Sequence, residues 1–130
     1  MVIRVVWADS GHKFITIQTL NNHWSVDEMR QAILTAWDMM KTVRHRVDVI
    51  WDVRAGNHLP PNCLALSRWM LYTRPANFGD VVILGGTPEI KAINTIVVQT
   101  YRHLLNLNYQ VLFVDSLDDV PAIAEQCTAL

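Results

Sequence analysis

Cysteine is scarce in this sequence, and long apolar runs are absent. The only two cysteines, Cys63 and Cys127, lie far apart and lack the CxxC spacing typical of tetrahedral zinc and dithiol redox sites. We therefore expect free thiols in a reducing compartment. No stretch approaches the ~20 apolar residues that a membrane span needs, and the first residues, broken by Asp9, lack the apolar core of a signal peptide. These absences predict a cytoplasmic protein with no integral membrane segment.

A large excess of charge of either sign is also absent. Eleven basic and twelve acidic residues give a formal net charge of -1, too little positive charge to neutralise a nucleic-acid backbone. The histidines lack the i, i+4 pairing of a helical metal site, and no G-x-S-x-G nucleophile elbow occurs. The sequence therefore predicts no nucleic-acid partner, no metal, no cofactor and no catalytic residue.

Apolar residues are what the sequence has in abundance, since they make up 51% of its 130 residues. That length and composition fit one domain over residues 1–130 with a layered core. Apolar and polar residues alternate in the runs expected to be strands, and apolar residues recur every three or four positions in the expected helices. Strands are expected at 2–8, 13–20, 46–53, 80–84 and 110–114. Helices are expected at about 26–41 and 60–72, from Pro88 onward, and after Ser116, with Pro121 in the first turn of the last one.

Local signals indicate where these helices begin. Ser25 and Glu28 have the spacing of a capping box. The run 60–62, Pro-Pro-Asn, is expected in the first turn of the second helix, where proline is tolerated. Thr87 before a proline predicts the cap of the third helix. The buried stripe of that helix is expected to comprise Ile90, Ile93, Val97, Tyr101 and Leu104.

The predicted order of elements is β-β-α-β-α-β-α-β-α, which indicates an α/β fold. Right-handed crossovers place each new parallel strand beside the last, so we expect a five-stranded mixed sheet in the order 1-2-3-4-5. The helices should then cluster on one face of the sheet. The opposite face should be partly wet, because polar residues alternate along the first three strands: Arg4, Thr16, Gln18, Asp48 and Asp52.

Polar residues gather in two loops at the expected carboxyl ends of parallel strands, where ligands usually bind. The loop after the third strand carries Asp52, Arg54, Asn57 and His58, and Gly85-Gly86-Thr87 follows the fourth strand at a helix N-terminus. One interpretation is an anion or ligand site on a shared rim. The other, which turn chemistry alone favours, is that the glycines form turns and Thr87 only caps a helix.

The tryptophans give a second candidate surface. Four of the five fall on apolar strand or helix positions or beside a helix cap and are interpreted as core residues. Trp69 and Arg68, on the second helix near Tyr72 and Arg74, are interpreted as an exposed aromatic-basic contact surface.

The opening hairpin, the strand 47–52 ending in Asp52, the loop into the second helix and the strand 81–84 resemble the STAS/SpoIIAA-like domains, the fold of bacterial anti-sigma-factor antagonists. In those antagonists this loop ends in a serine or threonine whose phosphorylation controls partner binding. Here the matching residues are Pro60-Pro61-Asn62-Cys63, which offer no hydroxyl. The resemblance therefore implies a STAS-like scaffold without the usual phosphorylation switch.

Two functional hypotheses follow. The favoured one is a non-catalytic regulatory or interaction module that binds a protein partner or small ligand through residues 52–62, Asn62 included, and the second helix. The alternative is an enzyme acting on a small molecule or anion at the rim of Arg54, His58 and Gly85-Gly86-Thr87, with His58 as its acid or base. The sequence leaves a homodimer open.

Overall fold

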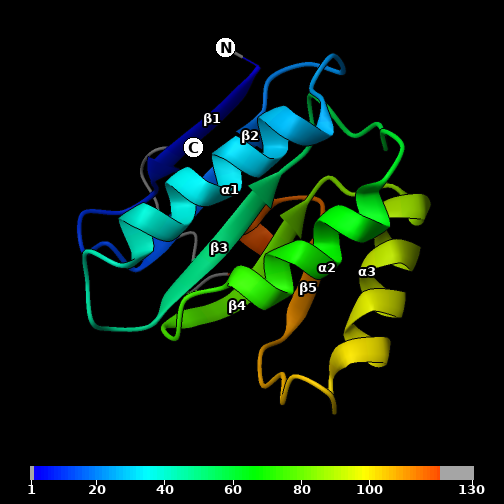
Figure 1. The fold of residues 1–130 in the computed structure, drawn as a ribbon. Coiled ribbons are helices and arrows are strands. Elements are labelled where there is room, and N and C mark those ends of the chain that lie inside the picture. Colours follow the sequence, from blue (N-terminus) through cyan, green and yellow to red (C-terminus); the bar gives the residue numbers. More distant parts are fainter. Residues whose placement is uncertain (1, 121–130) are drawn as a thin grey trace.

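The structure, a computed structural model, describes residues 2–120 (Figure 1). After an opening pair of strands, helices and strands alternate along this part of the chain. The strands are β1 Ile3–Trp7, β2 Phe14–Thr19, β3 Val47–Asp52, β4 Phe78–Leu84 and β5 Val111–Val114. The helices are α1 Val26–Met40, α2 Cys63–Thr73, α3 Pro88–Tyr101 and the short 3-10 helix η1 Leu117–Asp119. Within these residues no helix is long and apolar enough to cross a membrane.

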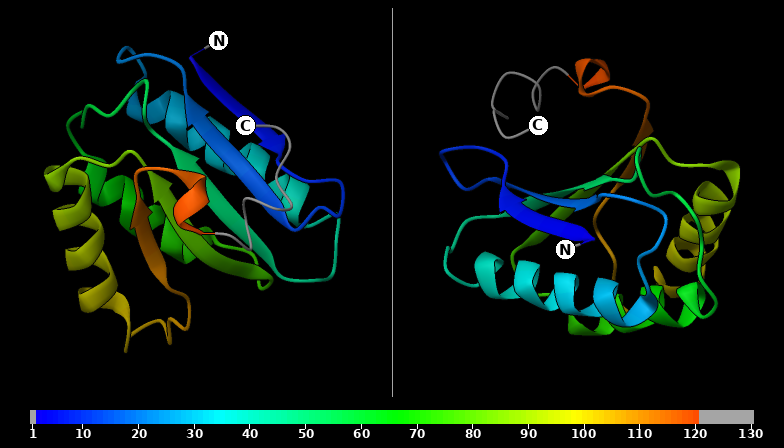
Figure 2. Two further views of the ribbon diagram at one scale, coloured as in Figure 1. Left: turned by 180° about the vertical axis from the view of Figure 1, so that it is seen from behind. Right: turned by 90° about the horizontal axis from the view of Figure 1, so that it is seen from above.

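The five strands form one mixed sheet in the order β1-β2-β3-β4-β5, which confirms the expected order. β1 and β2 are antiparallel, and the other neighbours are parallel. One row of the register runs Ile17, Trp51, Ile83, Phe113, and all four contribute to the core on the helix side. Figure 2 shows α1, α2 and α3 together on one face of the sheet, which is also as expected.

The helix starts follow the sequence signals, with one exception. Ser25 and Glu28 make both bonds of the capping box, and Thr87 accepts a hydrogen bond from the backbone N–H of Ile90. The prediction for α2 was wrong by a few residues: the prolines precede the helix instead of lying in its first turn. The chain turns at Asn62, whose φ is 71°, and α2 begins at Cys63. A left-handed residue cannot continue the helix, so the prolines belong to the incoming loop.

The main core lies between the sheet and the helices. Trp37 and Met40 of α1 and Leu71 of α2 are almost fully buried in it, and the indole N–H of Trp37 donates to the hydroxyl of Thr73 at 3.0 Å. The predicted stripe of α3 is correct at Ile90 and Val97 but wrong at Leu104, which is 69% exposed. Leu104 lies three residues beyond Tyr101, the last residue of α3.

The opposite face of the sheet is polar at its margins and apolar in its centre. Arg4 is exposed and Gln18 half-buried, as expected of a partly wet face, but Thr16 and Asp52 are buried. In the centre, Phe14, Ile50, Ala8 and Val82 form a small second core, against which Val114, Leu117 and Val120 pack. Ser116 caps only η1. The continuation of the predicted last helix through Pro121, and Cys127, lie outside the described residues.

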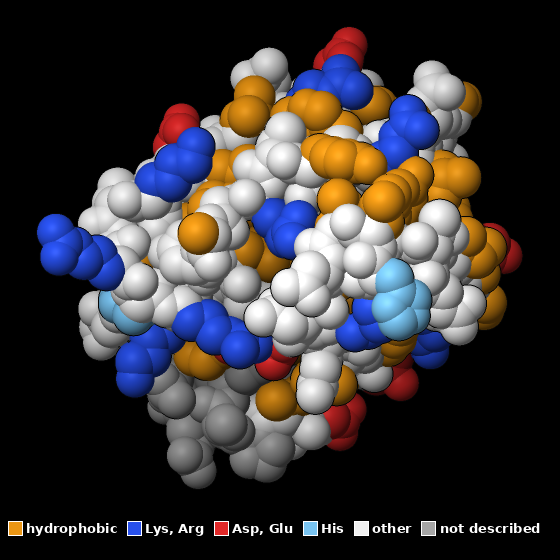
Figure 3. Space-filling model, turned by 60° about the horizontal axis from the view of Figure 1, so that its bottom comes forward, with side chains coloured by type: hydrophobic (Ala, Val, Ile, Leu, Met, Phe, Trp, Pro, Cys, Tyr) orange, Lys and Arg blue, Asp and Glu red, His pale blue; other side chains and the backbone are white. Residues whose placement is uncertain are grey.

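The three α-helices all end at the edge where β3, β4 and β5 begin, and each has a basic residue there. Lys41, Arg74 and Arg102 are the C-cap residues of α1, α2 and α3. Viewed from this edge, lysine and arginine side chains are scattered across the surface, and most visible acidic side chains lie toward its outline (Figure 3). Cations at helix C-termini offset the partial negative charge of the terminal carbonyls, so this basic edge stabilises the helices.

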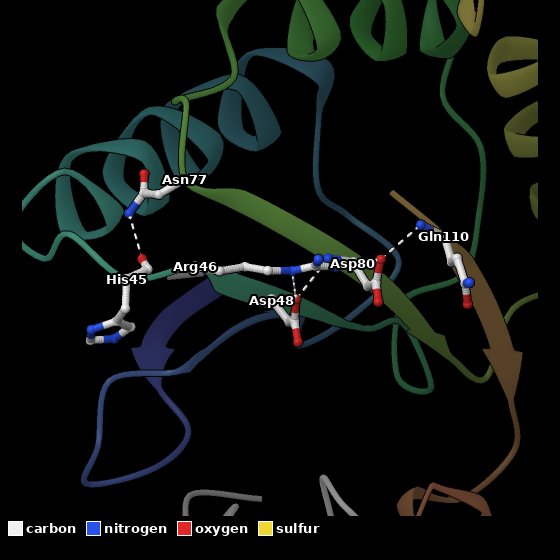
Figure 4. Close-up of polar contacts among 6 residues, drawn as sticks. All are labelled: His45, Arg46, Asp48, Asn77, Asp80 and Gln110. Atoms are coloured by element: carbon white, nitrogen blue, oxygen red, sulfur yellow. Dashed lines mark hydrogen bonds and ion pairs between the residues drawn. The ribbon is translucent and has the colours of Figure 1, made fainter. Parts of the chain in front are cut away.

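A network of carboxylates joins the starts of the strands at the same edge (Figure 4). Asp48 accepts a hydrogen bond from the backbone N–H of Asp80 at 2.7 Å, and Asp80 accepts one from the backbone N–H of Gln110 at 2.8 Å. The Arg46 guanidinium contacts both carboxylates, at 3.3 and 2.7 Å. Asn77 donates to the carbonyls of Met40, Val43 and His45. Side chains thus tie β3, β4 and β5 together where the ladder begins.

Candidate functional site

The loops after β3 and β4 meet at the carboxyl edge of the sheet, as the shared-rim interpretation required. The strands are neighbours, with Asp52 opposite Leu84. Gly85 follows Leu84 with a φ of 81°, and a Cβ added there would overlap the side chain of Arg54. Glycine is needed at position 85 both for its backbone conformation and for this close approach.

The Asp52 carboxylate is buried at this edge, with 1% of the residue exposed, and is paired with Arg54. Its Oδ1 accepts hydrogen bonds from Nε and the backbone N–H of Arg54, at 3.0 and 3.2 Å. Its Oδ2 accepts from Nη2 of Arg54 at 2.8 Å and from the Gln18 amide at 3.2 Å. The pKa of Arg54 is raised, chiefly by its side-chain hydrogen bond to Asp52. This bidentate geometry commits one side of the guanidinium to an internal partner.

His58 is turned toward the protein. Its Nε2 lies 2.9 Å from the carbonyl oxygen of Trp24, and its ring packs against the Trp24 indole at a centroid distance of 4.6 Å. A carbonyl can only accept, so Nε2 carries the proton and Nδ1 has the lone pair. Nδ1 is buried and has no hydrogen-bond partner among the described residues. Neither ring nitrogen is therefore offered to a molecule on the rim.

Gly56 fixes the loop to the segment before α1. Its carbonyl accepts hydrogen bonds from the Thr19 hydroxyl at 2.9 Å and the Trp24 indole at 3.0 Å. A Cβ at position 56 would overlap the backbone carbonyl of Asn21. The backbone N–H of His58 adds a bond to the Asn22 side chain at 3.3 Å. Sequence reasoning missed this role of Gly56, since the contact needs two loops far apart in the chain.

The remaining candidate residues of the rim are Gly86, Thr87, Asn57 and Asn62. Thr87 serves as the cap of α3, the role favoured by turn chemistry, and Gly86 packs near Ile83 and Ile90. Asn57 is half-buried. Asn62 is exposed and makes no side-chain capping bond to α2.

Trp69 is not the exposed contact residue that the sequence suggested. Its side chain is half-buried against the main core, and the Arg30 guanidinium of α1 lies 5.4 Å from its ring centroid. Position 69 adjoins the inward stripe of α2, which is why the side chain lies between core and solvent. Arg68 is exposed, as expected, and the large exposed side chains of α2 are Leu64 and Tyr72.

An apolar cleft of about 90 Å³ opens beneath the loop after β3, between α2 and α3. The sheet contributes Trp51 and Ile83 to its lining, and the loops contribute Trp24, Val53 and Leu59. The helices contribute Met29, Ile33, Cys63, Leu66, Ser67, Met70, Ile90, Ile93 and Asn94. Its half-exposed lining residues, which mark the opening, are Trp51, Leu59, Ser67, Ile93 and Asn94.

Three polar side chains of this lining, those of Trp24, Ser67 and Asn94, donate to backbone carbonyls. The Ser67 hydroxyl donates to the carbonyl of Cys63 at 3.0 Å, and the Asn94 amide donates to the carbonyl of Ile90 at 2.9 Å. Burial raises the pKa of the Cys63 thiol, so the neutral thiol is favoured. The cleft therefore presents an uncharged, mostly apolar interior. Sequence reasoning missed it, because its lining comes from segments that are far apart in the chain.

Among residues 2–120, no three histidine, cysteine, aspartate or glutamate side chains lie close enough together to hold a metal ion. The chain was also compared with known proteins. No protein-family model, curated protein or solved structure matches it.

Proposed function

We propose that this chain is a non-catalytic binding module of STAS-like type that takes a small apolar ligand into the cleft beneath residues 53–62 and α2. The observation that carries the proposal is the cleft itself. It lies at the carboxyl edge of a largely parallel sheet, the usual place of ligand sites in α/β folds. A cytoplasmic location is part of the same proposal.

The size and lining of the cleft suit an apolar group. Its volume of about 90 Å³ is larger than the ~30 Å³ that one water occupies in the liquid. Water entering it would meet few free polar partners, because Ser67 and Asn94 already donate to backbone carbonyls. An apolar molecule that fills the cleft would displace water that is poorly bonded there, which favours binding. Each ~100 Å² of apolar surface that such a ligand buries contributes about 2.5 kcal/mol.

The positions of the rim residues support binding without catalysis. A general acid or base must reach the proton that it transfers, at hydrogen-bond distance or through one water. The His58 Nε2 faces a carbonyl and its Nδ1 is buried, and Arg54 is paired with Asp52. The start of α2 likewise supports a module without a phosphorylation switch, because Asn62 and Cys63 stand where a hydroxyl would be needed.

Ligand binding is tested by adding a small apolar probe, toluene or 1-hexanol, and measuring the melting temperature and the tryptophan fluorescence. A ligand that binds only the folded state raises the melting temperature with its concentration. Trp24 and Trp51 line the cleft, so their emission should change as it fills. Ser67→Leu places an apolar side chain at the opening and should weaken probe binding by about tenfold or more.

The matched control is Arg68→Leu, which adds the same side chain at the next position of α2, exposed and outside the cleft lining. It should leave probe binding unchanged. Equal responses of the two variants to the probe, or no response of the unmodified protein to any apolar probe, would contradict the proposal.

A further inference from the structure

The outer face of α3 is uncharged over a length that α1 does not share. The ten residues from Ala92 to Tyr101 include no aspartate, glutamate, lysine, arginine or histidine. Ala92, Ile96 and Gln99 are exposed on one stripe, and Ile96 is 53% exposed. The exposed residues of α1 instead include Asp27, Glu28 and Asp38. α3 lies at the flank of the molecule (Figure 1).

Ionisable side chains return to this stripe only at its two ends, where an acid stands at one end and a base at the other. Glu89 lies in the first turn of α3, seven residues before Ile96, and His103 lies seven residues after it. The helical turn continues past Tyr101, whose carbonyl accepts the N–H of Leu105 at 2.9 Å. Seven residues span about 10.5 Å along a helix, so the two groups stand at equal distances from Ile96.

That spacing makes the face complementary to itself. When two such helices run antiparallel about a two-fold axis at Ile96, Glu89 of each copy lies opposite His103 of the other. An imidazole N–H can donate to the carboxylate, more strongly when the ring is protonated. Ile96 meets its own counterpart at the two-fold axis. A two-fold interface requires this kind of self-complementarity.

We propose that two copies of this chain pair through the outer face of α3, antiparallel and centred on Ile96. The proposal goes beyond the ligand-binding function and does not depend on it. Ile93 and Asn94, the α3 residues at the opening of the cleft, lie on a different side of the helix from Ala92, Ile96 and Gln99, which are absent from its lining. Pairing would therefore leave the cleft accessible.

The test is sedimentation equilibrium of the full chain over a range of concentrations near pH 6.5. We expect a concentration-dependent dimer whose dissociation constant rises about 30-fold or more with Ile96→Asp, as for an interface hot spot. The matched control is Leu34→Asp, which introduces the same side chain in place of an aliphatic residue of α1 that is 39% exposed. It should leave the dimer intact, and circular dichroism should show that both variants are folded.

The charge pattern gives a second, independent measurement. Glu89→Lys places a cation opposite His103 of the other copy and should weaken the dimer about fivefold or more, whereas Glu89→Lys combined with His103→Glu should restore it. A chain that is monomeric at every concentration would overturn the proposal. So would a dimer that Ile96→Asp leaves intact, or a double variant as weak as Glu89→Lys alone.

Discussion

The two edges of the sheet differ in the side chains that they carry. At the edge where β3, β4 and β5 begin, Arg46, Asp48 and Asp80 form a charged network that also binds backbone N–H groups. At the opposite edge Asp52 is buried and paired with Arg54, His58 is turned inward, and an apolar cleft lies beneath the loop after β3. The comparison teaches that charge in this fold secures the strands at one edge, whereas the other edge has space for a ligand.

The largest effect is expected when the Asp48 carboxylate, which joins β3 to β4, is removed. Asp48→Ala leaves the backbone N–H of Asp80 without its acceptor and deprives Arg46 of one partner. Hydrogen bonds to charged groups each contribute ~1.5–3 kcal/mol, so the free energy of unfolding should fall by about 3 kcal/mol. Urea unfolding followed by circular dichroism measures the loss.

The control for this variant is Asp38→Ala, since Asp38 is exposed on α1 and has no side-chain hydrogen bond or ion pair among the described residues. It should change the free energy of unfolding by less than ~0.5 kcal/mol. Equal effects at positions 48 and 38 would mean that the network is only a surface feature.

The next largest effect is expected at the opposite edge, at Gly56. In Gly56→Ala the new Cβ would overlap the carbonyl of Asn21, so the loop must move away from Trp24. Overpacking of this kind costs about 2 kcal/mol, and the displaced Trp24 should also weaken probe binding. Thermal unfolding and probe titration test the two effects together. The neighbouring exposed residue gives the control, and Ala55→Ser should alter neither quantity.

The smallest effect concerns the thiol at the start of α2. Burial raises the pKa of Cys63 in the folded protein, so above the ordinary thiol pKa of ~8.5 the unfolded chain loses its proton first. Stability is therefore fully present below that pH and falls as the pH rises above it. Urea unfolding between pH 7 and pH 9.5 should show a steeper decline for the unmodified protein than for Cys63→Val. Burial also raises the pKa of Tyr109, but that group should act only above a pH of ~10.

Local sequence signals predicted much of the architecture. The strand order followed from alternating strands and helices, and the caps at Ser25 and Thr87 follow from residue type and spacing alone. Predictions were wrong where the chain departs from regular periodicity. Asn62 takes a left-handed conformation that delays α2, and Leu104 lies beyond the end of α3.

The site was less accessible to sequence reasoning, because it depends on contacts between distant segments. Arg54 could be placed on the rim, but its pairing with Asp52 was not foreseen. The orientation of His58 depends on the Trp24 carbonyl, 34 residues away in the sequence. The cleft depends on how α2 and α3 pack over β3 and β4, which no single segment encodes. A volume left between packed elements has no local sequence signature.

We propose that the carboxyl edge of the sheet binds a ligand, whereas the opposite edge holds the strands together. The most direct measurement is a two-dimensional NMR titration of isotope-labelled protein with toluene, following backbone amides and isoleucine methyl groups. We predict shift changes at Ile33, Ile83 and Ile93, which line the cleft, and none at the amides of Asp48 and Asp80. Shifts confined to the amino-end edge, or no shifts at any position up to saturating toluene, would contradict the account.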